Sequence, residues 1–375
     1  MKLLFCLFKY FPYGGLQRDF RQIAEVCQNR GHSIHVYTMT WQGDVPEGFQ
    51  VTRFNPRGLT NHRKCLNFTK QVAARLAREQ FDLVIGFNKM PYLDIYYAAD
   101  PCYQAKVRED KGYFSRFSRR YRTYVALEKS VFDPKAKNHI LLIAENEKKQ
   151  FKHYYHTPDN RFHSLQPGIS RDRIPGNDAD TIRAHVRTEL KVSEDSHMLL
   201  MVGSSFKTKG LDRSLMALAS LPDALKQKTK LVVIGQGKSR TFLHLAKRLG
   251  IQKQIIFLGG REDVPRFLLG ADLLLHPAYS ENTGTVLLEA MASGLPVLAT
   301  DICGYASFVR DADAGLLIPS PFQQNILNNL LEHMLTSGHR PQWQKNGREY
   351  ITSMDMFGLP ERAVGMIESI AGNKA

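Results

Sequence analysis

Short apolar runs alternate with amphipathic stretches along the whole chain. In the first half, the runs at Leu3–Phe8, Ser33–Thr38 and Leu83–Gly86 predict buried strands, with a helix over Gln17–Arg30 between the first two. In the second half, strands are predicted in five ranges: Met198–Gly203, Lys230–Gly235, Ile255–Leu258, Leu273–His276 and Pro296–Thr300. Continuous apolar strands joined by helices are typical of parallel sheets. The sequence therefore predicts an α/β chain with two doubly wound sheets.

The helices predicted in the second half are Asp212–Leu218, Arg240–Leu249, Val286–Ala292 and a final amphipathic helix over Leu359–Ile370. A stretch rich in Pro, Gly and charge follows Pro167 and has the composition of an interdomain link. We therefore expect one domain over residues 1–165, together with about 355–375, and a second domain over 166–354. Open parallel sheets bind ligands beyond the carboxyl ends of their strands, so two such domains facing each other would enclose a cleft.

Composition narrows the class of protein. The chain has 51 Lys and Arg against 36 Asp and Glu, a net charge of +15, which indicates an anionic partner. No apolar run approaches the ~18 residues that span a bilayer, and we interpret the apolar N-terminus as a first buried strand and not as a signal peptide. The five cysteines are scattered without C-x-x-C spacing, which argues against a disulfide framework or structural zinc and favours the reducing cytoplasm.

Glycines follow two of the predicted strands. Gly14 and Gly15 come after the first strand and open a helix, where backbone N–H groups can approach an anion. Gly235 and Gly237 follow a strand of the second half. The G-x-G-x-x-G spacing is absent and no acidic residue closes the second strand, so a nicotinamide oxidoreductase is disfavoured.

The most informative segment runs from Tyr279 to Val297 and contains Glu281 and Glu289. If a helix starts near Thr283, Glu281 lies in the preceding loop and Glu289 in the second turn, about 7 Å along the axis from Gly284. The free N–H groups at the helix start then suit a phosphate, and they belong to Thr283, Gly284, Thr285 and Val286. Glu289 could accept hydrogen bonds from a ribose diol, and Glu281 could reach a transferred sugar. The alternative is a capped helix with two solvated glutamates.

The order of motifs around these glutamates resembles the donor-binding half of the retaining GT-B glycosyltransferases of family 4. The similarity runs from Ile255–Phe257 and Leu-Gly-Gly through Ala271-Asp-Leu-Leu-Leu-His-Pro and the two glutamates to Gly294-Leu-Pro-Val and Gly315-Leu-Leu-Ile-Pro. The resemblance implies two Rossmann-like domains, a nucleotide-activated sugar donor, no metal or other cofactor, and a C-terminal helix that returns to the first domain. It also implies that Glu281 contacts the donor sugar and Glu289 the ribose.

The family places a basic pair on the loop after the first strand of its second domain, where it holds the diphosphate. Here Lys209 matches the lysine of that pair, and Thr208 stands where the arginine is expected. The resemblance therefore leaves the second cation to Lys207 or to Arg173. Such a cation would stabilise the charge that builds on the leaving diphosphate. Arg261 is also expected on the nucleotide-sugar side.

The first half is similar to the lipopolysaccharide core glucosyltransferases of this family, in the segments Lys9–Phe20 and Gly86–Tyr103. That similarity implies that Gly15 lies by the diphosphate and that Asp100 hydrogen-bonds the donor sugar. Asp19 is a candidate for the acceptor side, and its alternative role is to interact with the dipole at the N-terminus of its helix.

The segment Tyr103–Lys137 is the most basic of the chain and interleaves aromatic residues with the charges. This composition on an amphipathic helix fits the interface of an anionic bilayer, although it could also hold nucleic-acid phosphates or form a solvated face. We take the membrane interpretation, with no nucleic-acid partner, because the resemblance implies an anionic glycolipid acceptor. The residues expected to contact the membrane are Tyr103, Lys111, Phe114, Arg116, Arg119, Arg120 and Arg122.

Together these features predict a retaining glucosyltransferase that moves glucose from UDP-glucose to inner-core heptose of lipopolysaccharide. Its catalytic residues would be Glu281, Asp100 and Lys209. We expect a cytoplasmic protein that associates peripherally with the inner membrane. Two alternatives stay open: a family 4 enzyme with another donor or acceptor, and a basic nucleic-acid-binding protein.

Overall fold

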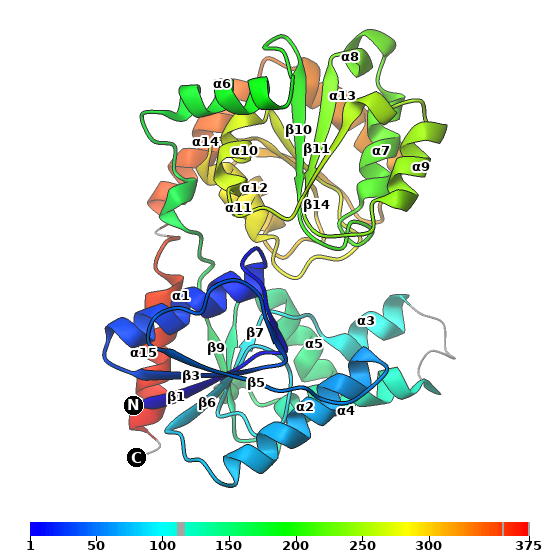
Figure 1. Cartoon of the computed structure of the whole chain (residues 1–375). Helices are drawn as coiled ribbons and strands as arrows, with labels where there is room; N and C mark the ends of the chain where they lie inside the picture. The colour runs from blue at the N-terminus through cyan, green and yellow to red at the C-terminus, as the bar shows by residue number, and fades with distance from the viewer. Residues whose placement is uncertain (111–116, 355, 374–375) are drawn as a thin grey trace. The chain divides into compact units, whose positions relative to one another are not determined.

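The computed structural model describes residues 1–110, 117–354 and 356–373, and it divides the chain into two compact units (Figure 1). The N-terminal unit comprises residues 1–167 and 358–375, and the C-terminal unit comprises residues 168–357. The sequence predicts the first boundary between residues 165 and 166 and the second between about residues 354 and 355. Within the described residues, no helix combines the length and the apolar character needed to cross a bilayer.

The N-terminal unit is built on a seven-stranded parallel sheet. Its spatial order is β5 (Phe49–Arg53), β3 (Ser33–Thr38), β1 (Lys2–Cys6), β6 (Leu83–Gly86), β7 (Ile95–Ala98), β8 (His139–Leu142) and β9 (Phe162–Ser164). A short pair, β2 (Lys9–Tyr10) and β4 (Thr40–Trp41), extends beyond β1 and β3. The central strands β1, β6 and β7 are almost wholly buried, which explains why they read as apolar runs.

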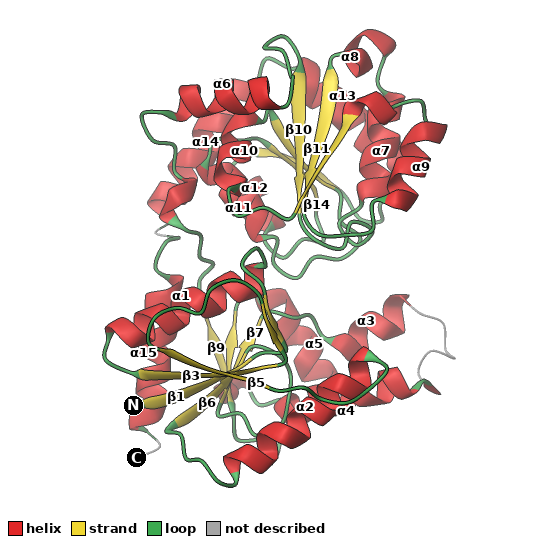
Figure 2. Cartoon of the chain, viewed as in Figure 1, coloured by secondary structure: helices red, strands yellow, loops and turns green. Residues whose placement is uncertain are grey.

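Helices cover both faces of this sheet (Figure 2). They are α1 (Gly15–Asn29), α2 (Asn61–Leu76), α3 (Tyr103–Asp110), α4 (Arg119–Phe132), α5 (Glu145–Tyr155) and α15 (Leu359–Gly372). The last of them packs against α1 and contributes Val364 and Ile367 to the same apolar core. Glu368 on α15 also links this helix to the residues that follow α1, because its carboxylate pairs with Arg30 at 2.7 Å and with His32 at 2.9 Å. The expected return of the C-terminal helix to the first domain is therefore confirmed.

The C-terminal unit contains a six-stranded parallel sheet. Its order is β12 (Ile255–Gly259), β11 (Thr229–Ile234), β10 (His197–Val202), β13 (Leu273–His276), β14 (Val297–Thr300) and β15 (Gly315–Ile318). The helices on its two faces are α6 (Ala179–Glu189), α7 (Leu211–Ser220), α8 (Asp223–Gln227), α9 (Arg240–Arg248), α10 (Val264–Gly270), α11 (Thr285–Ala292), α12 (Ala306–Asp311), α13 (Gln324–Thr336) and α14 (Arg340–Ser353). Both sheets are doubly wound, as predicted.

The structure also corrects the prediction for the basic segment. Instead of one amphipathic helix, α3 and α4 are separate elements, and the carboxylate of Glu128 on α4 is fully buried. It accepts hydrogen bonds from the backbone N–H groups of Tyr103 (2.7 Å) and Gln104 (3.0 Å), and it pairs with Lys89 at 2.5 Å. Glu128 thus caps the start of α3 and does not contribute to a charged surface.

Candidate active site

The carboxylate of Glu281, on the loop between β13 and α11, is enclosed by two nitrogen donors. Lys209 Nζ contacts its Oε2 atom, and His276 Nε2 lies 3.1 Å from the same oxygen. His276 is fully buried at the end of β13. Burial alone would raise the pKa of Glu281, but the hydrogen bond from His276 and the charge of Lys209 lower this pKa to about 2. Glu281 is therefore ionised at neutral pH and can only accept hydrogen bonds.

Lys209 comes from the loop that follows β10, the strand directly beside β13 in the sheet. Its aliphatic stem passes over Gly203, where an added Cβ would lie 3.2 Å from Lys209 Cε. Gly203 also has a φ of +146°, which a residue with a side chain rarely adopts. The strand-end glycine therefore leaves the room in which the lysine stem reaches Glu281.

The helix after Glu281 begins at Thr285, one residue before the predicted range Val286–Ala292 and two residues after the start considered near Thr283. Gly284 is its N-cap and has a left-handed φ of +83°, so this residue cannot belong to the right-handed helix. Thr283 is outside the helix too, and its carbonyl accepts a hydrogen bond from the N–H of Tyr305 at 2.7 Å. The first N–H groups of α11, which begin with Thr285 and Val286, follow directly after the Glu281 loop and suit an anionic group.

Glu289 lies in the second turn of α11 and is only 3% exposed, so the alternative of two solvated glutamates is wrong. Its Oε1 atom is 3.3 Å from Nε of Arg173, whose side chain is 4% exposed. Ser293 joins the same elements, since its hydroxyl donates to the carbonyls of Arg173 and Glu289. Arg173, one of the two residues considered for the second cation, is thus placed against Glu289.

Lys207, the other residue considered for the second cation, contacts Asp212 on α7 and Tyr279 on the loop between β13 and α11. Its Nζ atom lies 2.5 Å from Asp212 Oδ2 and 3.0 Å from the hydroxyl of Tyr279. Arg261 likewise has a local partner, because it forms a two-pronged ion pair with Asp263 at 2.7 Å for each contact. The structure brings together Lys209, His276 and Glu281, and it joins neither Lys207 nor Arg261 to them by an ion pair among the described residues.

The N-terminal unit holds the three other predicted site residues. Gly15 is the first residue of α1 and is exposed, and a Cβ there would meet no atom within 4 Å. Asp100 is exposed on the connection between β7 and α3. Asp19 is the fifth residue of α1 and accepts a hydrogen bond from the Tyr97 hydroxyl at 2.9 Å. The interpretation of Asp19 as a partner of the helix dipole is therefore wrong, because this residue lies beyond the first turn and binds a strand residue.

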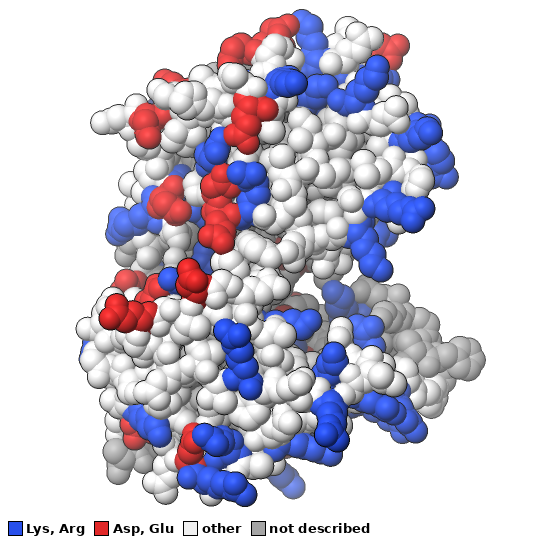
Figure 3. Space-filling model, viewed as in Figure 1, with Lys and Arg blue, Asp and Glu red and all other residues white. Residues whose placement is uncertain are grey.

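Several predicted membrane contacts are exposed on the N-terminal unit. Arg119, Arg120 and Arg122 open α4 and are all exposed, and the neighbouring Phe117 is 63% exposed. Tyr103 is half-buried between α3 and α4, with its ring 5.2 Å from that of Tyr124. Figure 3 shows basic side chains gathered over the region of α2 and α4. Lys111, Phe114 and Arg116 lie outside the described residues.

Sequence reasoning missed His276, although the residue is visible in the motif Leu-Leu-Leu-His-Pro. The signal that could have found it is its position at the end of a buried strand, five residues before Glu281. A histidine there is directed to the same end of the sheet as the functional loops. Elsewhere, the described residues bring together no group of three or more His, Cys, Asp or Glu side chains that could hold a metal ion.

Comparisons with known proteins show the family. Residues 13–173 match the model for glycosyltransferase family 4, and residues 183–350 match that for glycosyl transferases group 1. The lipopolysaccharide glucosyltransferase WaaG of Escherichia coli (strain K12) is 44% identical over 368 residues, which cover 98% of each chain. The chain belongs to the WaaG family of glycosyltransferases. It is therefore a glycosyltransferase enzyme, as the motifs predicted.

Solved structures agree with this assignment. The crystal structure of WaaG, described as a glycosyltransferase involved in lipopolysaccharide biosynthesis, superposes with a TM-score of 0.95 at 43% identity and covers 97% of this chain and 99% of that one. Sucrose-phosphate synthase from Thermosynechococcus elongatus matches with a TM-score of 0.79 at 18% identity over the full length of both chains, a likeness of fold alone. The predicted GT-B fold is confirmed.

Proposed function

We propose that this glycosyltransferase moves glucose from UDP-glucose to a heptose of the lipopolysaccharide inner core. The observation that carries the proposal is the Glu281 carboxylate held by Lys209 and His276 at the start of α11, with Glu289 buried on the same helix. The name of the E. coli relative, which aligns over nearly the whole chain, supports glucosyl transfer in lipopolysaccharide synthesis.

Each group of this cluster has a role that follows from its charge. Glu281, ionised and fixed by two donors, accepts hydrogen bonds from hydroxyls of the donor sugar. Lys209 and the N-terminus of α11 supply positive charge for the diphosphate as it leaves. Glu289 accepts hydrogen bonds from the ribose diol, with Arg173 holding its carboxylate in place. For the N-terminal unit we keep the roles that the family resemblance implies, donor contacts for Gly15 and Asp100, and we give Asp19, which accepts a hydrogen bond from Tyr97 on β7, a role toward the acceptor.

Retention of configuration is part of the proposal, without a protein nucleophile. Lys209 and His276 both contact Oε2 of Glu281, which leaves Oε1 for the hydroxyls of the donor sugar, and the low pKa of this carboxyl makes it a weak nucleophile. We therefore give Glu281 an electrostatic and positioning role, and the leaving diphosphate takes the proton of the acceptor hydroxyl.

The deciding assay measures sugar transfer to a heptose-terminated lipopolysaccharide precursor from UDP-glucose, UDP-galactose and UDP-N-acetylglucosamine. We expect UDP-glucose to be used best, with Glu281→Gln lowering kcat while UDP affinity stays within about twofold. Glu349→Gln on α14, an exposed carboxylate, is the matched control. Preferential use of another donor would replace this proposal by the alternative of a different family 4 specificity.

We also propose that transfer needs no metal, because Lys209 and the α11 N-terminus provide the positive charge that a divalent cation would supply. Activity should survive exhaustive treatment with EDTA. Loss of activity that manganese or magnesium restores would contradict this part of the proposal.

Peripheral attachment to the cytoplasmic face of the inner membrane is the third part of the proposal. Exposed arginines beside Phe117 at the start of α4 fit the interface of an anionic bilayer, at about 1 kcal/mol for each basic residue near the surface. The triple change of Arg119, Arg120 and Arg122 to Gln should reduce binding to vesicles that contain anionic lipid. A control that removes the same charge from the C-terminal unit, at the exposed Lys238, Arg240 and Lys247, should not.

Competition separates this proposal from nucleic-acid binding. Double-stranded DNA is added to the vesicle-bound enzyme at ~0.15 M salt, where exposed charges are screened beyond ~8 Å. Vesicle binding that persists supports the membrane interface. Displacement by DNA, with a steeper dependence of binding on salt, would favour the nucleic-acid alternative.

A further inference from the structure

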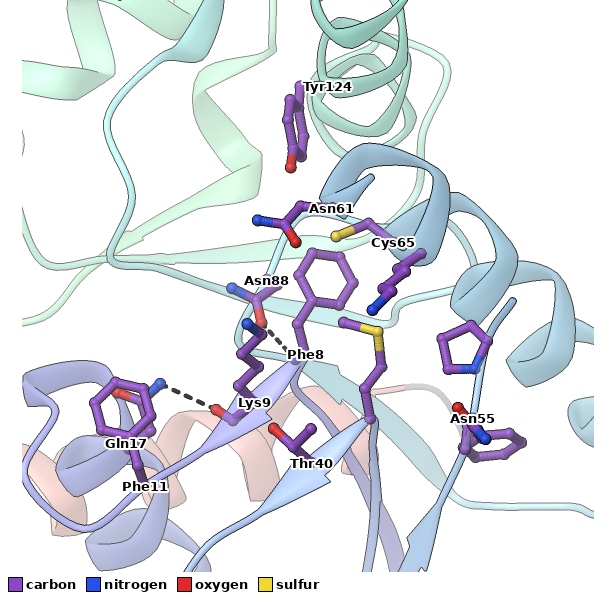
Figure 4. Close-up of a pocket in the computed structure, with 14 residues that line it drawn as sticks. Phe8, Lys9, Phe11, Gln17, Thr40, Asn55, Asn61, Cys65, Asn88 and Tyr124 are labelled. Carbon is purple, nitrogen blue, oxygen red and sulfur yellow. Dashed lines mark hydrogen bonds between the residues drawn. The ribbon is translucent and has the colours of Figure 1, made fainter. Parts of the chain in front are cut away.

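A pocket of about 390 Å³ opens in the N-terminal unit at the carboxyl ends of four neighbouring strands (Figure 4). Phe8 and Lys9 follow β1, Met39 follows β3, Phe54 follows β5 and Asn88 follows β6. These four strands are adjacent in the sheet. The strand order reverses between β1 and β6, and open α/β sheets bind ligands at such a point. The volume falls within the ~300–1,000 Å³ range of small-molecule sites.

The lining of this pocket contains cations and amides but no carboxylate. Its charged groups are Lys9 and Lys64, and neither takes part in an ion pair among the described residues. Its other polar side chains are Gln17, Thr40, Asn55, Asn61, Asn88 and Tyr124, and the aromatic rings of Phe8, Phe11 and Phe54 supply apolar walls. Amides and rings suit the hydroxyls and the C–H faces of a sugar, whereas two lysines without acidic partners suit an anion.

The start of α2 adds to the positive charge of the pocket. Asn61 is the first residue of this 16-residue helix, Lys64 lies in its first turn, and no acidic residue is in that turn. The N-terminus of α2 therefore contributes its own partial positive charge on the side from which Lys64 projects.

Hydrogen bonds fix part of the lining before any ligand arrives. The N–H of Phe8 donates to Asn88 Oδ1 at 2.7 Å, which leaves the Asn88 amide N–H groups as donors, and Gln17 Nε2 donates to the carbonyl of Lys9 at 3.0 Å. In Figure 4 the side chains of Lys9, Asn61 and Asn88 point toward the same space. Because these side chains are already held in place, little conformational entropy is lost when a ligand binds.

We propose that this pocket binds an anionic sugar, a pyranose that carries a carboxylate or a phosphate, and that Lys9 and Lys64 select for its charge. Its role as the acceptor subsite rests on the proposed function. In that role, the pocket would make the enzyme prefer acceptors with an acidic sugar close to the accepting residue over neutral acceptors of the same size.

Methyl NMR of the full chain measures this binding without any transfer reaction. The chain has 11 methionines, of which Met39 lines the pocket and Met291 is buried in the C-terminal unit. With ¹³C-methyl methionine, and the Met39 signal assigned through Met39→Leu, the protein is titrated with D-glucuronate, glucose 6-phosphate, D-glucose and inorganic phosphate. We expect both sugar anions to shift the Met39 signal at concentrations at least about tenfold lower than neutral glucose does.

Single changes at the two lysines should weaken this binding. Lys9→Gln and Lys64→Gln should each weaken binding of the sugar anions about tenfold, whereas Lys70→Gln, an exposed lysine further along α2, should leave it unchanged. In the transfer assay the same two variants should raise KM for the acceptor and leave KM for UDP-glucose unaltered. An unchanged signal from Met90, which is buried in the N-terminal unit, shows that a variant keeps the fold of that unit.

The outcomes separate this proposal from the proposed function. Sugar anions that bind in a lysine-dependent way while no transfer from UDP-glucose occurs would refute the function and support the pocket. Normal transfer with unaltered acceptor KM in both lysine variants would refute the pocket and leave the function standing. Equal affinity for glucose and glucuronate, or inorganic phosphate binding as tightly as the sugar anions, would also overturn the proposal.

Discussion

Replacing His276, whose imidazole contacts Glu281, should show how the site keeps that carboxylate ionised. In His276→Leu the carboxylate keeps Lys209 but loses the hydrogen bond of 3.1 Å from a fully buried donor. A hydrogen bond to a charged group contributes about 1.5–3 kcal/mol. The desolvation of Glu281 is unchanged, so the pKa of this carboxyl should rise from about 2 toward its ordinary value.

The sign of the effect on stability follows from linkage. The pKa of Glu281 is lower in the folded state than its ordinary value of 4.5, so the ionised carboxylate stabilises the fold at pH values above about 4.5. This stabilisation is lost as the pH falls from there toward 2. At about 1.4 kcal/mol per pKa unit, it is on the order of 3 kcal/mol, shared between His276 and Lys209.

Urea unfolding from pH 2.5 to 7 tests this reasoning. Relative to wild type, His276→Leu should lose about 1.5–3 kcal/mol of unfolding free energy at pH 7, and the difference should shrink toward pH 2.5. Asp272, whose pKa is also about 2, titrates in both proteins and cancels in the difference. His276→Gln, which keeps a donor, should recover part of the loss and part of kcat. A difference that stays constant with pH would refute the role of His276 in holding the charge.

Three further changes test other contacts. Glu289→Ala should weaken UDP binding by about 1.5–3 kcal/mol in calorimetric titration, and an unchanged Kd would remove the ribose assignment. Gly203→Ala should lower kcat at least tenfold with little change in the circular dichroism spectrum, because the new methyl group would lie 3.2 Å from Lys209 Cε and push the lysine side chain away from Glu281. Full activity of this variant would show that the lysine side chain can adjust to the methyl group. Glu128→Gln should lower the unfolding free energy by about 3–5 kcal/mol, since Lys89 would keep a buried charge without its carboxylate, and denaturant unfolding measures this loss.

Many of the buried strands were predictable because their apolar runs are continuous. The limits of β3, β6 and β13 agree with the prediction, those of β14 differ by one residue at one end, and those of β10 and β11 differ by one residue at each end. The prediction omitted β7 and β8 although both are buried apolar runs, and it also omitted β15, β5 and β9. At the sheet edges, β5 and β9 are partly exposed and interrupted by polar residues, as in Phe-His-Ser of β9. Pattern alone cannot separate such short mixed segments from loops.

The separate residues of the candidate site were also predictable, but their contacts were not. Motif order identified Glu281, Glu289 and Lys209, whereas the pairing of Arg173 with Glu289 depends on how a short helix of the link packs against α11. The range Val286–Ala292 places α11 to within one residue, but the start considered near Thr283 was too early, because Gly284 is compatible with a helix or a cap and only its left-handed backbone decides between them. Contacts of this kind arise from tertiary packing, which local sequence does not encode.

Strand order explains why functional residues gather where they do in each unit. In the C-terminal sheet the order reverses between β10 and β13; Lys209 follows β10, whereas His276 is the last residue of β13 and Glu281 follows it. In the N-terminal sheet the order reverses between β1 and β6, and Lys9 and Asn88 follow those two strands. At such a point the two connections leave toward opposite faces of the sheet, so the space above the strand ends stays open for a ligand. The same rule that places Lys209 beside Glu281, although they are 72 residues apart in the chain, therefore places the lysine-lined pocket at the equivalent position of the other unit.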